Sequence, residues 1–329
     1  MRRPRVLLTN PIDRAGAEIL APHADIALAA ATDPDTLRRE VRDADALVVR
    51  ALLPTDLFEH APRLRAVVRH GAGVDLIAVG AATALGIPVA NVPAVNAPTV
   101  AEYVVGQFLM HAHRLASIDR TMRTAGWSAA RGLADGAVEL AGKTVGVVGV
   151  GAIGTEIARI CAAGLRMKVL GHRRRLDALP AFVAPAALDD LFGAADFITL
   201  ACPLTEATRG LASAPLIARM KPTAFLVNVS RGAVVDQAAL TRALAERRIG
   251  GAALDVFAVQ PLAPDDPLMR LDNVALSPHL AGISRESMAR LSRIAAEETL
   301  RILAGERPLN FVNPECWPAS LRRRAELGY

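Results

Sequence analysis

A glycine-rich segment, residues 143–171, constrains the fold more than any other part of this 329-residue chain. An apolar, β-branched run over 144–148 is followed by three glycines with GxGxxG spacing, Gly149, Gly151 and Gly154. A helical pattern and a second apolar run, 167–170, complete a strand, turn, helix and strand. In this context the glycines allow a tight turn, close approach of a pyrophosphate and close helix–strand packing. The segment therefore predicts a dinucleotide-binding βαβ unit, with the pyrophosphate at the helix N-terminus.

The residues after the second apolar run indicate which dinucleotide binds. NAD sites usually carry Asp or Glu about 20 residues past the glycines, where the acid holds the ribose 2′-hydroxyl. Here that position is occupied by His172, Arg173 and Arg174, and no acid occurs before Asp177. A carboxylate would repel a 2′-phosphate, whereas a guanidinium forks onto it. We therefore predict that NADP(H) binds in preference to NAD(H), with Arg173 and Arg174 at the phosphate. The alternative is a solvated basic turn.

Length and composition favour a globular protein of two domains. The chain is long enough for two cores, and a composition of 52% hydrophobic and 22% charged residues excludes a disordered protein. No run of about 18 uncharged apolar residues is present, and no N-terminal apolar segment ends in a small-residue cleavage site. We therefore expect neither a membrane span nor a signal peptide.

The cysteines and histidines do not indicate a metal site. Cys161, Cys202 and Cys316 are far apart and lack ligand spacing, which favours reduced thiols and a cytoplasmic setting. His111 and His113 are two residues apart in a helical segment, so they point to different faces. We expect no metal.

The net charge of +5 does not indicate nucleic-acid binding. The arginines are scattered, only 4% of residues are aromatic, and no basic stripe is interleaved with aromatic residues. The basic run 322–324 is expected to be a solvated face of the C-terminal tail.

The remaining chain alternates strand-like and helical segments, which predicts doubly wound parallel sheets. Strands are predicted at 5–9, 46–50, 65–69, 87–90, 196–201, 224–229, 251–256 and 273–276. Shorter helices are predicted at 14–20, 35–42, 211–220 and 237–247. A long apolar helix from Thr99 to about Thr124 should be buried in the core or against another subunit. Another, over 285–305, is expected to return to the first domain.

Ordered motifs over almost the whole chain resemble the D-isomer-specific 2-hydroxyacid dehydrogenase family. They are the glycine fingerprint and the runs 70–75 (HGAGVD), 100–102 (VAE), 202–208 (CPLTEAT), 228–232 (NVSRG), 253–257 (ALDVF) and 277–279 (SPH). The resemblance implies an α/β fold of two Rossmann-like doubly wound parallel-sheet domains with the active site in the cleft between them. It implies a discontinuous substrate-binding domain, 1–98 and 287–329, an NADP-binding domain, 99–286, and a homodimer made by the long helices of the cofactor domain.

The same resemblance implies roles for individual residues. Arg231 and His279 would be catalytic, and the backbone amides of Ala72 and Gly73 would bind the substrate carboxylate. Besides the three glycines, His172, Arg173 and Arg174, the cofactor would be contacted by Thr99, Ala152, Ile153, Cys202, Pro203, Thr208, Val229, Ser230, Arg231, Asp255, His279 and Ala281.

The chemistry of these residue types agrees with that assignment. Reduction of a 2-oxo acid needs a cation for the carboxylate, a hydride donor and an acid for the carbonyl oxygen. Arg231 follows a predicted buried strand, and its fork can hold the carboxylate and polarise the carbonyl. His279 follows another, and histidine can give a proton in one direction and take it in the other.

One departure from the family pattern concerns Gln260. The family carries a catalytic Glu there, which orients the histidine, whereas formate dehydrogenases of the family also carry Gln. We predict a glyoxylate or hydroxypyruvate reductase type of enzyme acting on a small 2-oxo or 2-hydroxy acid. The alternatives are a phosphoglycerate or sulfolactate dehydrogenase, and a non-enzymatic NADP(H)-sensing protein on the same fold.

Overall fold

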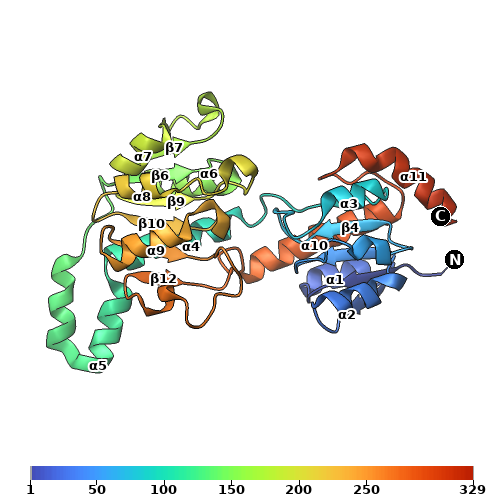
Figure 1. Ribbon diagram of the computed structural model, residues 1–329, viewed down its shortest axis with the longest axis horizontal. Coiled ribbons are helices and arrows are strands. Elements are labelled where there is room, and N and C mark those ends of the chain that lie inside the picture. The colour runs from blue at the N-terminus through green and yellow to red at the C-terminus, as the bar shows by residue number, and fades with distance from the viewer. Residues whose placement is uncertain (1, 329) are drawn as a thin grey trace. The chain divides into compact units, whose positions relative to one another are not determined.

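The computed structural model describes residues 2–328, which form two compact units. Unit 1 comprises the chain up to Asn96 and the residues from Ser284 onward, and unit 2 spans Ala97–Ile283. None of the helices in the described range is long and apolar enough to cross a membrane. Each unit is built on its own parallel sheet (Figure 1).

Unit 1 holds a five-stranded sheet in the order β2-β1-β3-β4-β5, with every neighbouring pair parallel. Its strands are β1 (Arg5–Leu8), β2 (Asp25–Leu28), β3 (Ala46–Val49), β4 (Ala66–Arg69) and β5 (Val89–Ala90). Its helices are α1 (Arg14–Leu20), α2 (Pro34–Glu40), α3 (Val79–Ala84), α10 (Arg285–Leu303) and α11 (Trp317–Glu326).

Unit 2 holds a seven-stranded sheet in the order β12-β11-β10-β9-β6-β7-β8, again with parallel pairs. Its strands are β6 (Thr144–Val148), β7 (Lys168–His172), β8 (Ala184–Pro185), β9 (Phe197–Leu200), β10 (Phe225–Asn228), β11 (Gly251–Leu254) and β12 (Val274–Leu276). Its helices are α4 (Ala97–Ala112), α5 (Leu115–Leu133), α6 (Ala152–Arg159), α7 (Leu188–Ala194), α8 (Ala214–Arg219) and α9 (Gln237–Ala245).

Alternation along the strands explains why both sheets are covered on two faces. In β1, Leu7 joins one hydrophobic cluster, while Val6 and Leu8 join the cluster on the other face. In unit 2, Phe225 of β10 packs into one cluster and Leu226 into the other. Such continuous apolar strands are typical of parallel sheets buried on both sides. The prediction of two doubly wound parallel sheets is confirmed.

Two predictions from the sequence are wrong. The long helix from Thr99 is broken, because Arg114 takes a left-handed conformation (φ 54°) between α4 and α5, and Gly126 (φ 79°) interrupts α5. The C-terminal arginines are not simply solvated, because two of them bind main-chain carbonyls. Arg323 donates to the carbonyls of Ala61, Pro62 and Leu64, and Arg324 donates to those of Ile302 and Leu303.

Candidate functional site

The glycine turn after β6 has the geometry of a phosphate-binding loop. Gly149 has φ +95°, and a Cβ there would meet the backbone nitrogen of Cys202 at 2.4 Å. A Cβ on Gly154 would lie 2.1 Å from the carbonyl oxygen of Gly149, so close packing requires glycine at both positions. At Gly151, by contrast, a Cβ would meet nothing within 4 Å, which leaves room for a ligand. Helix α6 begins directly afterwards, so its first amides face that space and fit a pyrophosphate.

The other candidate cofactor contacts of unit 2 gather at the same edge of the sheet. All seven strands are parallel, so the residues that follow them meet at one edge. Sheet order reverses between β6 and β9, and ligands of doubly wound sheets bind at such a switch point. The edge carries His172, Cys202, Pro203, Val229, Ser230, Asp255 and Ala281. Thr208 closes its own turn by donating to the carbonyl of Pro203 (2.7 Å).

The loop after β10 holds Arg231 through its backbone. Asn228, the last residue of β10, is buried; its side-chain oxygen accepts from the amide of Ser230 (3.0 Å) and its nitrogen donates to the carbonyl of Arg231 (3.1 Å). A Cβ on Gly232 would lie 1.9 Å from the carbonyl carbon of Phe257, so the loop packs directly on the chain after β11. Arg231 is therefore presented from a tightly fixed turn, with its guanidinium donating to the Ser230 carbonyl (2.8 Å).

The loop after β12 holds His279 through Asp255. The Asp255 carboxylate is almost fully buried and accepts from the Ser277 hydroxyl (2.6 Å) and from the amides of Leu280 (2.8 Å) and Ala281 (2.9 Å). His279 itself has φ +56°, and its amide donates to the Asp255 carbonyl (2.9 Å). Left-handed backbone is costly for a residue with a Cβ and persists where the surroundings enforce it. The four bonds to Asp255 supply that enforcement and leave the imidazole on the exposed side of the loop.

Helix α4 braces the same loop. The Tyr103 hydroxyl lies 2.6 Å from the Ser277 hydroxyl, so a chain of hydrogen bonds runs from α4 through Ser277 to Asp255. Burial raises the pKa of Tyr103 above its ordinary value. Thr99 lies one helical turn before Tyr103, on the same side of α4.

Gln260 and the basic residues 172–174 lie in the segments at the ends of β11 and β7. Gln260 is exposed and lies five residues past Asp255. After β7, Arg173 is partly buried, and its guanidinium donates to the Ala178 carbonyl (2.9 Å), which folds it over the turn; Arg174 is exposed. His172 is tied to the Ala186 carbonyl through Nδ1 (3.0 Å).

Comparison with known proteins identifies the family. Residues 105–281 match the model of a family described as D-isomer specific 2-hydroxyacid dehydrogenase, NAD binding domain. The chain belongs to the D-isomer specific 2-hydroxyacid dehydrogenases. It is therefore an oxidoreductase that uses a nicotinamide cofactor.

Several members of the family are similar to this chain over at least 94% of its length. A glyoxylate reductase of Korarchaeum cryptofilum is 38% identical over 95% of this chain and 97% of the relative. A D-3-phosphoglycerate dehydrogenase of Methanocaldococcus jannaschii is 35% identical over 94% of this chain but only 59% of the relative. Among solved structures, an NADPH-dependent glyoxylate/hydroxypyruvate reductase of Sinorhizobium meliloti, in complex with NADP and malonate, superposes with a TM-score of 0.83; it is 29% identical, over 96% of this chain and 98% of that one.

The remaining candidate residues of this dehydrogenase, Ala72 and Gly73, belong to unit 1. They follow β4, at the carboxyl edge of that unit's own sheet. The preceding His70 is buried, with Nε2 2.8 Å from the Ser292 hydroxyl of α10. Burial, assisted by the nearby cations Arg50 and Arg69, lowers the pKa of His70 to about 4. This histidine is therefore neutral at physiological pH and serves as an anchor of the loop.

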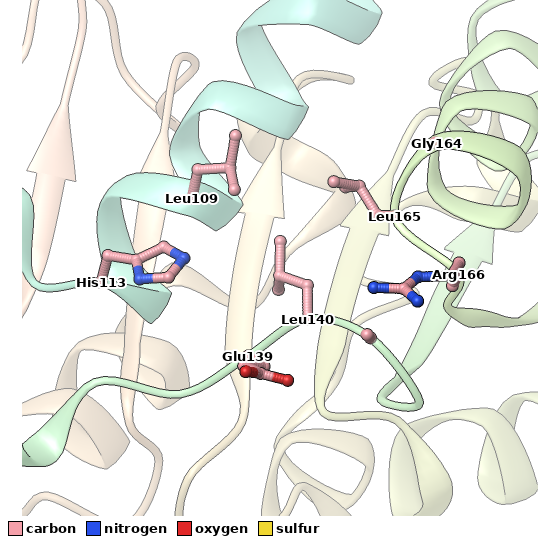
Figure 2. Close-up of a pocket in the computed structure, with 8 residues that line it drawn as sticks. Leu109, His113, Glu139, Leu140, Gly164, Leu165 and Arg166 are labelled. Atoms are coloured by element: carbon pink, nitrogen blue, oxygen red, sulfur yellow. The ribbon is translucent and has the colours of Figure 1, made fainter.

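The pocket in Figure 2 is separate from the candidate site of the dehydrogenase. It has a volume of about 240 Å³ and is lined by Leu109, His113, Glu139, Leu140, Ala141, Gly164, Leu165 and Arg166. Leu140 and Ala141 precede β6, and Arg166 precedes β7, so the pocket lies at the amino edge of the sheet. The candidate contacts lie at the opposite, carboxyl edge.

Asn228, Tyr103 and Ser277 hold the loops of Arg231 and His279, a role that the sequence patterns do not indicate. The resemblance assigns Asp255 to the cofactor, whereas the structure gives its carboxylate three partners within the protein. Position offered a signal in two cases, because Asn228 ends one strand and Asp255 directly follows another. Polar residues at the carboxyl ends of buried parallel strands are candidates for such bracing.

Proposed function

We propose that this dehydrogenase reduces small 2-oxo acids of the glyoxylate and hydroxypyruvate type with NADPH and catalyses the reverse oxidation of 2-hydroxy acids. The observation that supports this proposal most directly is the placement of Arg231 and His279. They follow β10 and β12, which are separated in the sheet by β11 alone. Two strand spacings set the loops about 10 Å apart, a span that a small substrate can bridge.

Each side chain of the pair has a distinct task in this proposal. A bound nicotinamide supplies or accepts the hydride at the substrate carbon. Arg231 forks onto the carboxylate and draws electron density from the carbonyl. His279 donates its proton to the carbonyl oxygen during reduction and takes it back during oxidation. The backbone amides of Ala72 and Gly73 contribute further donors to the carboxylate.

An activity assay tests this function. NADPH oxidation should be measured with glyoxylate, hydroxypyruvate, pyruvate and 3-phosphohydroxypyruvate. We expect turnover with the first two, and Arg231→Ala should nearly abolish it while NADPH still binds. Arg231→Lys should retain partial activity, because an ammonium cannot fork. Loss of NADPH affinity in step with activity would instead make Arg231 a cofactor or structural residue.

The second candidate function is the reduction of 3-phosphohydroxypyruvate, the phosphorylated compound in this assay. Similarity to the phosphoglycerate dehydrogenase of M. jannaschii favours its inclusion, since the same hydride chemistry applies. A kcat/KM that is highest with 3-phosphohydroxypyruvate would replace the glyoxylate assignment.

We further propose a preference for NADP(H), supported by Arg173 on the turn after β7. A charge-assisted hydrogen bond to the 2′-phosphate should favour NADPH by about 1–3 kcal/mol. Arg173→Asp should reverse the preference, because a carboxylate repels the phosphate and accepts from the ribose hydroxyl. The measurement is kcat/KM for both cofactors, with Arg175→Asp, two residues further along the turn, as the control. Equal efficiency with NADPH and NADH in the unaltered protein would refute this preference.

A further inference from the structure

The loop that follows β4, residues 70–75, is held by the side chain of Arg69, the last residue of that strand. We call residues 70–75 the Gly71 loop. The Arg69 guanidinium donates through Nε to the Gly73 carbonyl (3.0 Å) and through Nη1 to the carbonyls of His70 (2.6 Å) and Val49 (3.0 Å). One side chain therefore joins the start of the loop, its middle and the end of β3.

Glycine at position 71 makes room for this guanidinium. Gly71 has φ +143°, and a Cβ there would lie 3.3 Å from the guanidinium carbon and from both of its terminal nitrogens. The side chain of Arg69 thus passes directly under the loop backbone. An L residue at 71 would be strained in this conformation and would also press on the arginine.

The remaining carbonyls of the loop are also bound to the scaffold. The Gly71 carbonyl accepts from the amide of Val92 (2.9 Å), and the Ala72 carbonyl accepts from the Asn91 side chain (2.7 Å). Together with the bonds from Arg69, four consecutive carbonyls, those of residues 70–73, have donors. Within residues 2–328, the amides of Ala72 and Gly73 donate to no acceptor.

A loop with bound carbonyls and with amides that have no acceptor resembles the backbone anion sites of other proteins. Successive amides that face one way form a concavity with positive partial charge, which suits a carboxylate. Fixed donors are effective because they do not have to reorganise when the anion arrives. Here the carbonyls are held by Arg69, by Asn91 and by the amide of Val92, and the Arg69 guanidinium adds a full positive charge close to the loop backbone.

We propose that Arg69 is a positioning residue for the substrate carboxylate: it holds the Gly71 loop so that the amides of Ala72 and Gly73 can receive the anion. This inference rests on the proposed function. Arg69 acts through the loop, whereas Arg231 acts on the substrate itself. Asn91 has a smaller share of the same task, since it holds one carbonyl.

Kinetics and direct binding test the proposal. Arg69→Met should raise two constants by about tenfold or more, because the oriented donors are lost. They are the KM for glyoxylate and the dissociation constant of oxalate, which is measured by calorimetry with NADP⁺ present. The kcat and NADPH dissociation constant of this variant should change little. Arg69→Lys should lie between Met and the unaltered protein, because an ammonium cannot span three carbonyls. Asn91→Ala should shift the same two constants in the same direction, by less.

Arg323→Met is the matched control. Arg323 also bonds three main-chain carbonyls in unit 1, those of Ala61, Pro62 and Leu64, but these precede β4 instead of following it. Its loss should lower the melting temperature and leave the KM and the oxalate constant unchanged. The proposal is overturned if Arg69→Met only lowers stability in the manner of Arg323→Met.

Two further outcomes are decisive. If Arg69→Met does not fold, Asn91→Ala carries the test, and unchanged constants in that variant overturn the proposal. If the unaltered protein reduces no 2-oxo acid, the proposed function fails, but oxalate calorimetry still compares the unaltered and Arg69→Met loops. Absence of oxalate binding by the unaltered protein would overturn the inference as well.

Discussion

At the scale of single residues, we expect position 260 to influence the pH dependence of the proposed reaction. An adjacent carboxylate favours an imidazolium, whereas a neutral amide cannot do so by charge. In the proposed reaction His279 gives its proton to the substrate during reduction, so a carboxylate at position 260 should preserve the active form to higher pH. We expect Gln260→Glu to move the upper limb of the kcat/KM profile for 2-oxo acid reduction upward by about one pH unit.

The control for this prediction is Gln237→Glu. The Gln237 side chain accepts from the amide of Ala258 (2.8 Å). The Gln237→Glu variant therefore places a negative charge near the same segment of chain without altering position 260. Profiles should be recorded from acidic to alkaline pH in all three proteins. Superimposable profiles for Gln260→Glu and the unaltered protein would show that position 260 does not act on the proton donor.

The sequence singles out candidates for the chemistry more readily than it singles out the residues that hold their loops in place. Arg231 and His279 follow predicted strands, and their side chains suit the reaction, so pattern and chemistry point to the same two positions. Asn228 and Arg69 act through hydrogen bonds to main-chain carbonyls. Such partners depend on the backbone path of neighbouring loops, which local sequence patterns do not contain.

At the scale of elements, the packing of α1 against α10 depends on a glycine. A Cβ on Gly16 would lie 2.4 Å from the carbonyl oxygen of Ser292, a backbone atom that cannot swing aside. Gly16→Ala should therefore lower the free energy of unfolding by about 1–3 kcal/mol through overpacking. Gly80→Ala in α3 is the control, because nothing lies within 4 Å of its Cβ position.

The control should respond in the opposite direction. An alanine in an open helical position restricts the unfolded chain, so Gly80→Ala should be neutral or stabilising by about 0.5 kcal/mol. Denaturant unfolding of both variants measures the difference. Equal stability of Gly16→Ala and Gly80→Ala would contradict the close approach of α1 and α10.

Element boundaries were less predictable than element types. Buried strands such as β10 follow from continuous apolar runs, because both of their faces are covered. The edge strand β2 was missed, since Ile26 and Leu28 are partly solvent-exposed and its composition carries no burial signal. The break after α4 was missed because Arg114 is not a residue that ordinarily takes left-handed backbone.

At the scale of the whole molecule, the two doubly wound sheets followed from βα alternation along the chain. The discontinuity of unit 1 could be expected because α10 begins too far past β12 to be a crossover helix. In the structure, α10 packs on α1 and β4 of unit 1. Short βα repeats of this kind encode sheet topology locally, which is why the architecture was accessible from sequence.

Assembly is the last expectation at this scale. In Figure 1, α5 projects from the sheet of its own unit, and Ala130 is its one buried residue. The helix exposes Leu115, Met122 and Trp127, the last at 72%. Apolar side chains of this size gathered on one element are typical of a protein interface. We expect a homodimer that uses α5, with a sedimenting mass of about twice 34.7 kDa.

Trp127→Asp tests this interface, because a desolvated carboxylate opposes association. Sedimentation at micromolar concentration should then show the monomer. Leu309→Asp is the control: Leu309 is 74% exposed, lies in unit 1 and should leave the dimer intact. A monomeric unaltered protein would refute the dimer, whereas dissociation by Leu309→Asp but not by Trp127→Asp would move the interface from α5 to unit 1.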